Sequence, residues 1–219
     1  MNNIILIAPP AAGKGTMAKM LSEKYGYLNI SVGQLLRNID PETELGKMIR
    51  VYQQNRELVD NEIVFEALKE KLSLPNALDN GIILDGFPRN MEQAEVLKRL
   101  EEELNFKINK IVYINIDYET ALKRTLGRLI CSECKTVYNI NTGFNNPIND
   151  KTCRICNANL ERRNDDNEIS LNKGFEKFNN EILPLIEYYK SFTEVIEIDG
   201  NGSAEDTFKE LEKKLKSLW

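Results

Sequence analysis

The sequence predicts an α/β protein, built as a parallel sheet flanked by helices with one small cysteine-rich insertion. Short apolar runs alternate with stretches of helical periodicity along the chain, and this alternation is typical of a parallel sheet with helices on both faces. A turn of small residues follows the first apolar run, and all four cysteines fall in one polar segment. The 219 residues suffice for one domain with an insertion or for two small domains.

Each expected strand is a short apolar run of the kind that is buried in parallel sheets. In chain order the runs are 3–7, 28–31, 81–85, 110–117 and 194–199.

Helices are expected where apolar residues recur at three- and four-residue spacing between cap and breaker residues. The expected stretches are 14–25, 31–40, 42–55, 61–72, 91–103, 118–128, 166–190 with a kink at Pro184, and a last helix after 199.

The stretch "APPAAGKGT" (8–16) departs from the P-loop pattern G-x-x-x-x-G-K-[ST]. Ala8 stands in place of the first glycine, and Gly15 separates Lys14 from Thr16. Its position between a strand and a helix still favours a phosphate-binding loop, because turn amides and a helix N-terminus point at an anion. Lys14 adds a positive charge, and Thr16 offers a hydroxyl to Mg²⁺. The alternative is a plain small-residue turn. Alanine at 8 or 11 either avoids φ > 0 or carries strain.

Two C-x-x-C pairs, at 131–134 and 153–156, are separated by eighteen residues. This spacing is that of zinc ribbons, in which four thiolates complete a closed tetrahedral site. A closed site leaves no position for substrate, so Cys131, Cys134, Cys153 and Cys156 are expected to hold a structural metal ion, either Zn²⁺ or another metal that binds tetrahedrally. The alternative is four free thiols.

The composition narrows the possible partners and chemistry. The net charge is −5, which argues against bulk attraction to nucleic acid or an anionic membrane. The absence of histidine excludes histidine bases, nucleophiles and metal ligands. Without an apolar run long enough for a span or a signal peptide, we expect a cytoplasmic protein.

Cationic side chains are expected at the carboxyl ends of the strands, where ligands bind in such sheets. Phosphoryl transfer requires mainly alignment, Mg²⁺ and positive charge around the moving group. The candidates are Lys14, Arg37, Arg89, Arg124, Arg128 and Arg163.

The segment "LDGFPRNMEQ" (84–93) resembles the signature of the adenylate kinase family, and "GRLIC" and "RRNDD" follow in that family's order. The chain thus resembles, from end to end, a long-lid adenylate kinase of the zinc-binding type. The resemblance implies a P-loop NTPase-like core at 1–30, 61–127 and 164–219, a monophosphate-binding segment at 31–60, and a zinc-ribbon-like lid at 128–163. It also implies that a cytoplasmic monomer, without nucleic-acid or membrane partners, converts ATP and AMP to two ADP with Mg²⁺.

The resemblance further implies residue roles. Catalysis would rest on Lys14, Arg37, Arg89, Arg128 and Arg163. ATP would contact Ala11, Ala12, Gly13, Lys14, Gly15, Thr16, Arg124, Arg128, Val137, Tyr138 and Gly202. AMP would contact Val32, Arg37, Glu57, Leu58, Val59, Gly86, Phe87, Pro88, Arg89, Gln93 and Arg163. Mg²⁺ would be held through water by Asp85 and Thr16, and the lid arginines would be oriented by Asp165 and Asp166.

Departures from the family pattern keep other functions open. Val32 and Gln34 differ from common choices near the acceptor, and Gly174 stands eleven residues after Arg163, where the family places a second lid arginine. One alternative is a diverged relative with weak transfer or another acceptor. A remote alternative is a zinc-ribbon nucleic-acid binder, which would need a basic, aromatic ribbon.

Overall fold

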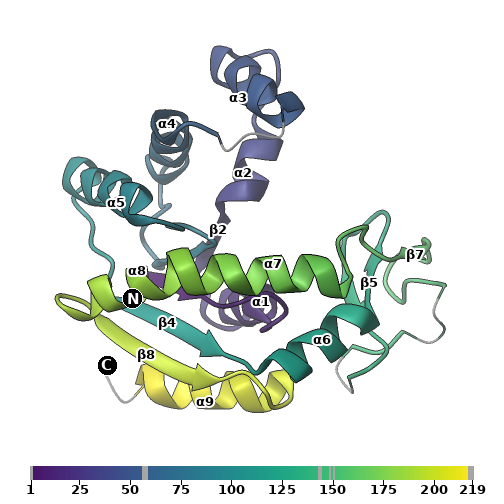
Figure 1. Ribbon diagram of the computed structural model, residues 1–219. Helices are drawn as coiled ribbons and strands as arrows, with labels where there is room; N and C mark the ends of the chain where they lie inside the picture. The colour runs from purple at the N-terminus through teal and green to yellow at the C-terminus, as the bar shows by residue number, and fades with distance from the viewer. Residues whose placement is uncertain (1, 56–58, 143–144, 148, 150, 217–219) are drawn as a thin grey trace. The chain divides into compact units, whose positions relative to one another are not determined.

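A five-stranded sheet in the order β2-β3-β1-β4-β8 forms the centre of the computed structural model (Figure 1). The structure describes residues 2–55, 59–142, 145–147, 149 and 151–216. The strands are β1 (Ile4–Ile7), β2 (Leu28–Ser31), β3 (Ile82–Asp85), β4 (Lys110–Asn115) and β8 (Glu194–Asp199). β1 pairs in parallel with β3 and β4, and β2 pairs in parallel with β3. The parallel sheet flanked by helices that the sequence predicts is therefore confirmed.

Complete burial of the central strands explains their uniformly apolar sequences. All four residues of β1 are buried, and Ile83 and Ile111 on the neighbouring strands are fully inaccessible to solvent. A strand covered on both faces reads as a continuous apolar run, as parallel sheets require.

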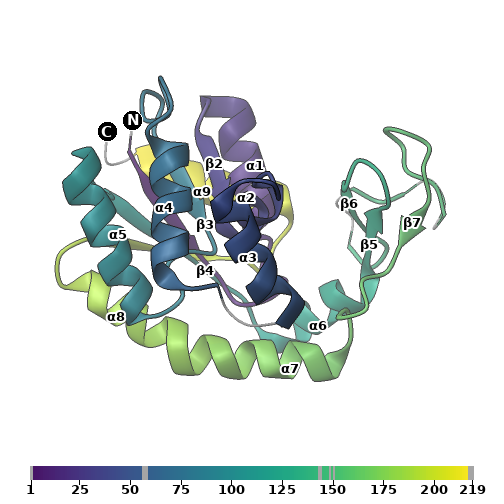
Figure 2. The ribbon, with the colours of Figure 1, turned by 90° about the horizontal axis from the view of Figure 1, so that it is seen from above.

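The helices lie close to the stretches expected from periodicity (Figures 1 and 2). They are α1 (Lys14–Tyr25), α2 (Val32–Asn38), α3 (Glu44–Asn55), α4 (Asn61–Leu72), α5 (Met91–Leu104), α6 (Tyr118–Gly127), α7 (Glu168–Lys177), α8 (Leu183–Lys190) and α9 (Ala204–Lys216).

Side-chain caps determine where several helices begin. A carboxylate or amide oxygen accepts a hydrogen bond from an N–H group of the first turn, which has no partner within the helix. The caps with such a bond are Asp60 of α4, Asn90 of α5, Asp117 of α6 and Asn167 of α7.

The long helix expected over 166–190 is interrupted before its proline. α7 ends at Lys177, a π-helical turn covers Phe178–Ile182, and α8 then begins at Leu183. Proline has no N–H and its ring collides with the carbonyl four residues earlier. The residue four positions before Pro184 is Asn180, which lies within the π-helical turn, and Pro184 itself lies in the first turn of α8.

α4 and α5 are joined by charged side chains around one aromatic ring. Arg99 donates two hydrogen bonds to Glu62, at 2.5 and 3.1 Å, and its guanidinium lies 4.4 Å from the centroid of the Phe65 ring. Lys69 forms an ion pair with Glu103 at 2.6 Å on the same pair of helices.

The cysteine-rich insertion forms a small antiparallel sheet of its own. β5 (Arg128–Cys131) pairs with β6 (Val137–Asn139) and with β7 (Leu160–Glu161). Leu129, Tyr138 and Leu160 make a separate small core with Cys131 and Cys153.

The chain divides into two compact units. The first comprises 1–7, 15–113 and 181–196, and the second comprises 8–14, 114–180 and 197–219. The phosphate-binding turn and the insertion thus belong to the second unit. Within the part of the chain that the structure describes, no helix has the length and apolar character needed to cross a membrane.

Candidate phosphate and metal sites

The turn between β1 and α1 has the backbone of an anion-binding loop. Two residues of the turn, Ala11 at φ 61° and Gly13 at φ 88°, adopt left-handed conformations, and α1 begins directly at Lys14. Successive turn residues of alternating hand direct neighbouring N–H groups into one concavity, and the first turn of a helix adds further free N–H groups. The stretch can therefore hold a phosphate.

The backbone conformations of Ala11 and Ala8 show at which of the two positions alanine carries strain. Its φ of 61° lies in the left-handed region, which disfavours an L-residue by about 1–2 kcal/mol. Ala8 is not among the described residues with positive φ, so a glycine is not needed there. The loop thus contains one strained alanine and one relaxed alanine.

Two glycines of the second unit lie where a Cβ atom would come within 3 Å of another residue, and one of them, Gly174, lies directly beside this loop. A Cβ atom at Gly174 of α7 would lie 2.6 Å from Cγ of Pro10. A Cβ atom at Gly200 would lie 2.8 Å from the carbonyl oxygen of Asn115 and 3.5 Å from that of Ala12. The glycine at 174 therefore has a packing reason, and an arginine at this position would require α7 or the loop to move.

Arg124 ties α6 to the same loop. Its guanidinium donates to the carbonyl oxygen of Ala11 at 3.4 Å and to that of Gly202 at 2.7 Å. Burial lowers the pKa of Arg124, while the nearby carboxylates Asp117 and Asp199 act in the opposite direction. Arg124 thus holds the loop and the 201–202 turn at a fixed spacing.

The expected acceptor-side residues belong to the first unit. Asp85 ends β3, where it is paired in register with Leu6 of β1 and with Ser31 of β2. The exposed Arg89 donates from Nε to the carbonyl oxygen of Gly86 at 2.8 Å, which leaves its two terminal nitrogens for a ligand. Arg37 is exposed at the end of α2.

Gln93 has part of its hydrogen-bonding capacity occupied. Its Oε1 accepts from the backbone N–H of Arg89 at 2.9 Å. The –NH₂ group is then the part of the amide that a ligand base can use.

Apolar residues complete the expected acceptor side. Val32, Phe87 and Pro88 are buried, and Val59 is half-buried. Glu57 and Leu58, which the resemblance also implies, lie outside the described residues.

One of the two lid arginines is bound to a buried carboxylate. Arg128 donates from Nε to both oxygens of Asp166, at 3.0 and 3.1 Å, and its NH2 group also contacts Asp166. The Asp166 side chain is completely buried, so it is costly to leave unpaired. Arg163 and Asp165 are exposed, and neither side chain forms a hydrogen bond or ion pair with the other among the described residues.

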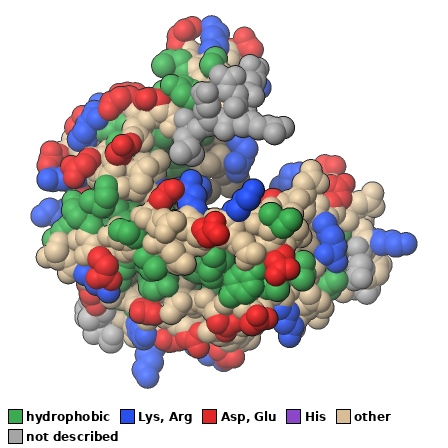
Figure 3. Space-filling model, in the orientation of Figure 1, with side chains coloured by type: hydrophobic (Ala, Val, Ile, Leu, Met, Phe, Trp, Pro, Cys, Tyr) green, Lys and Arg blue, Asp and Glu red, His purple; other side chains and the backbone are tan. Residues whose placement is uncertain are grey.

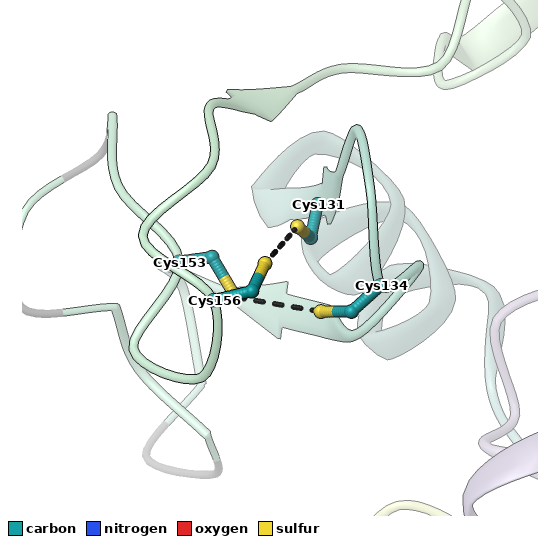
Figure 4. Close-up of side chains that lie close together, drawn as sticks. All are labelled: Cys131, Cys134, Cys153 and Cys156. Atoms are coloured by element: carbon teal, nitrogen blue, oxygen red, sulfur yellow. Dashed lines mark hydrogen bonds between the residues drawn. The ribbon is translucent and has the colours of Figure 1, made fainter.

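The four cysteines form a cluster that could hold a metal ion (Figure 4). All four sulfur atoms lie within 4.8 Å of one another, and the closest pairs are Cys131 with Cys156 at 3.3 Å and Cys134 with Cys153 at 3.5 Å. Tetrahedral zinc bound to sulfur at about 2.3 Å places the sulfurs roughly 3.8 Å apart. The observed sulfur–sulfur distances, from 3.3 Å to at most 4.8 Å, lie on both sides of this value, so the four cysteines fit zinc.

Hydroxyl groups lie within hydrogen-bonding distance of two of the four sulfur atoms. Tyr138 Oη lies 3.2 Å from Sγ of Cys153 and accepts from the N–H of Arg154 at 3.0 Å. Burial raises the pKa of Cys153, but hydrogen bonds from Tyr138 and from the N–H groups of Cys156 and Ile155 outweigh it, so the pKa falls to about 6. The hydrogen bond with Thr136 lowers the pKa of Cys134. A metal ligand must be a thiolate, so these contacts favour the binding form.

Tyr138 is a structural residue of the insertion. Its ring is 1 % exposed and packs with Leu129 and Leu160, whereas Val137 beside it is 45 % exposed. A nucleotide contact at Tyr138 could therefore involve only its backbone.

The charged side chains on the visible face of the protein are mixed in sign. In Figure 3, red and blue groups alternate over the described residues rather than separating into a basic stripe. A nucleic-acid-binding surface is typically a basic patch, so this face gives that alternative no support.

A strand, an anion-binding turn and a helix, placed on a parallel sheet flanked by helices, define the class of P-loop nucleotide-binding proteins.

Comparison with known proteins identifies the family. Residues 6–194 match the family model for adenylate kinase. The adenylate kinase of Archaeoglobus fulgidus is 38% identical over 217 residues, 99% of each chain. That of Caldicellulosiruptor bescii is 39% identical over 213 residues, 97% of this chain and 98% of its own. The chain therefore belongs to the adenylate kinase family, and it is a nucleoside monophosphate kinase.

Several structural contributors were not found by the sequence reasoning. The contact of Gly174 with Pro10 joins residues far apart in the chain, and the hydroxyl of Tyr138 is indistinguishable in sequence from any core tyrosine. The only available signal for Gly174 was a glycine inside an otherwise helical pattern.

Replacing Ala11 by glycine is expected to stabilise the protein. Relief of the left-handed strain should exceed the entropy that glycine adds to the unfolded chain, giving a gain of about 0.5–1 kcal/mol in the free energy of unfolding. Urea unfolding of Ala11→Gly and of the unmutated protein measures this difference, provided that the two transitions have the same dependence on urea concentration. Ala12→Gly is the control: Ala12 is buried and is not among the positive-φ residues, so its replacement should destabilise. A loss of stability in Ala11→Gly would contradict the expected strain.

Proposed function

We propose that this protein transfers the γ-phosphoryl group of ATP to AMP and releases two molecules of ADP. The observation that carries the proposal is the turn at Ala11–Gly13, whose left-handed residues lead directly into α1 at Lys14. Family membership supports ATP, AMP and ADP as the nucleotides.

In the reaction an oxygen of the AMP phosphate attacks the γ-phosphorus, and the bond from that phosphorus to the β-phosphate oxygen breaks. The protein contributes alignment and positive charge, because charge shifts onto the phosphoryl oxygens in the transition state. The loop N–H groups and Lys14 would bind the β- and γ-phosphates. Arg37 and Arg89 would hold the AMP phosphate, and Arg128 and Arg163 would act from the lid.

The remaining expected roles follow from the same proposal. Arg124 would lie against the ATP base, and the backbone at Val137, Tyr138 and Gly202 beside it. Asp166 would keep Arg128 oriented through their ion pair, with Asp165 assisting. Mg²⁺, bound with ATP, would neutralise charge on the phosphates, and the oxygen groups of Thr16 and Asp85 suit it.

A diverged enzyme with slow transfer or another acceptor is the second candidate. Gly174 favours it, because the chain lacks an arginine at that position and the contact with Pro10 leaves no room for one without movement. A coupled assay with ATP and each of AMP, CMP, GMP and UMP distinguishes the two.

Lys14→Ala is expected to reduce kcat/KM about 10²-fold or more, the scale for removing one preorganised transition-state contact. The coupled assay with AMP measures it. Lys19→Ala is the matched control, because Lys19 lies on the same helix and forms, among the residues that the structure describes, a surface ion pair with Glu23 alone, at 3.6 Å. An unchanged rate in Lys14→Ala would mean that the turn does not bind the transferred group.

Gln93→Leu should weaken AMP binding and relax base choice, because it removes the amide that matches adenine. Leucine also releases the N–H of Arg89, so Gln93→Glu is the informative companion: it keeps the acceptor for that N–H and replaces the –NH₂ donor by a charged carboxylate oxygen. KM for AMP should rise in both variants. A rise in Gln93→Leu alone would assign Gln93 to holding Arg89, and a better rate with CMP or UMP in the unmutated protein would refute AMP as the acceptor.

The insertion is proposed to hold one structural zinc ion. Metal analysis of protein purified without chelator should give about one zinc per chain, and Cys134→Ser should reduce it. Removal of zinc should lower the thermal stability of the insertion, since binding free energy adds to folding, while the central sheet should persist because it contains no cysteine. Four thiols titrating freely in the native protein would rule out the site.

A further inference from the structure

The C-terminal end of α6 is bound by side chains of the lid. The last carbonyl groups of an α-helix have no partner within the helix. Asn139 donates from Nδ2 to the carbonyl oxygen of Arg124 at 2.8 Å, and Asn141 donates to that of Lys123 at 3.0 Å.

The other end of the lid reaches the same turn. Arg162 donates from NH1 to the carbonyl oxygen of Leu126 at 2.5 Å, and the N–H of Ile140 donates to that of Gly127 at 2.9 Å. Arg162 also places a positive charge at a helix C-terminus, where the helix dipole favours a cation. The turn after β6 and the segment that follows β7 are therefore both attached to α6.

Gly127 makes this attachment possible. A Cβ atom there would lie 2.5 Å from Oδ1 of Asn139 and 2.7 Å from Cβ of Asn141. The two asparagines thus lie directly against the backbone of the last helical turn, in contacts that any larger residue would disrupt.

The same turn of α6 carries the link to the phosphate loop. Asn139 binds the backbone carbonyl of Arg124, and the guanidinium of Arg124 binds the carbonyl oxygens of Ala11 and Gly202. All of these residues belong to one compact unit. A continuous set of hydrogen bonds therefore runs from the lid through α6 to the loop.

We propose that Asn139, Asn141 and Arg162 are positioning residues of the ATP site, which hold the lid in register with Arg124 and the phosphate loop. The inference rests on the proposed function in taking ATP as the ligand of that loop. A lid that is already placed costs ATP less ordering free energy on binding than one that must be ordered by the ligand. Loosening the attachment should then weaken ATP binding and change AMP binding little, since of the expected AMP contacts only Arg163 lies in this unit, whereas Arg89 and Gln93 lie in the other.

Asn139→Asp removes the N–H donor to the carbonyl of Arg124 and keeps the oxygen that accepts from Asn141. Oδ1 of Asn139 accepts from the N–H of Asn141 at 2.9 Å, and an aspartate retains this acceptor. The carboxylate would instead face the carbonyl of Arg124, with a negative charge at the wrong end of the helix dipole. The Kd for ATP, measured by titration calorimetry, should rise about 3–10-fold, the scale of one hydrogen bond, and the Kd for AMP should change less than about 2-fold.

Asn159→Asp is the matched control. It introduces the same charge elsewhere on the lid, at an exposed residue whose side chain has no hydrogen bond or ion pair among the described residues, and should leave both Kd values unchanged. A second pair tests the other attachment: Arg162→Met should weaken ATP binding and Arg162→Lys should restore most of it, because lysine keeps a cationic donor near the carbonyl of Leu126.

The outcomes separate this inference from the proposed function. Weaker ATP binding in Asn139→Asp and Arg162→Met, with unchanged AMP binding and rescue by lysine, supports it. Equal changes for both nucleotides would indicate a general structural defect and overturn it, as would unchanged ATP binding. If Asn139→Asp does not fold, the Arg162 pair decides. Failure of the unmutated protein to bind ATP would overturn the proposed function as well.

Discussion

The structure depends on holding one short turn of backbone, Pro9–Gly13, in a conformation that an open chain would not keep. Ala11 there has a left-handed φ of 61°, which is unfavourable for any L-residue other than glycine. Two segments of the same unit restrict the turn: α7, whose Gly174 leaves no room for a Cβ atom beside Pro10, and α6, whose Arg124 donates to the carbonyl oxygen of Ala11. Strain of this kind persists only where surrounding contacts over-determine it, and these contacts do so.

The insertion at 128–163 has internal support and is attached to the rest of its unit through the end of α6 and through the ion pair of Arg128 with Asp166. It has its own three-stranded sheet and a core of Leu129, Tyr138 and Leu160 around two of the four cysteines. So few apolar residues bury little surface, and domains of this size usually need a metal or disulfides. The cysteine cluster meets that need, and Tyr138 belongs to both the core and the support of Cys153.

The arginines of this protein differ in burial and in whether their guanidinium groups already have partners. Arg128 faces a fully buried carboxylate, Asp166, and the hydrogen bonds of Arg124 within the described part of the chain go to backbone carbonyls. Arg37, Arg89 and Arg163 are instead exposed. The protein contacts of Arg124 and Arg128 fix the orientation of their guanidinium groups before a ligand binds, whereas the exposed guanidinium groups can be oriented by the phosphate itself. The surroundings of each side chain therefore decide how far the arginine is preorganised.

The sequence by itself determined the parallel sheet, the order of its helices, the phosphate loop and the cysteine cluster. Each of these rests on local signals: apolar runs, helical periodicity, a glycine–lysine turn and paired C-x-x-C spacing. Only the tertiary structure decided which of Ala8 and Ala11 is strained, why position 174 is a glycine, and how Asn139, Asn141 and Arg162 bind the end of α6. Those features join residues that are distant in the chain, and whether a side chain meets a partner there depends on how closely two backbones approach, which no local pattern records.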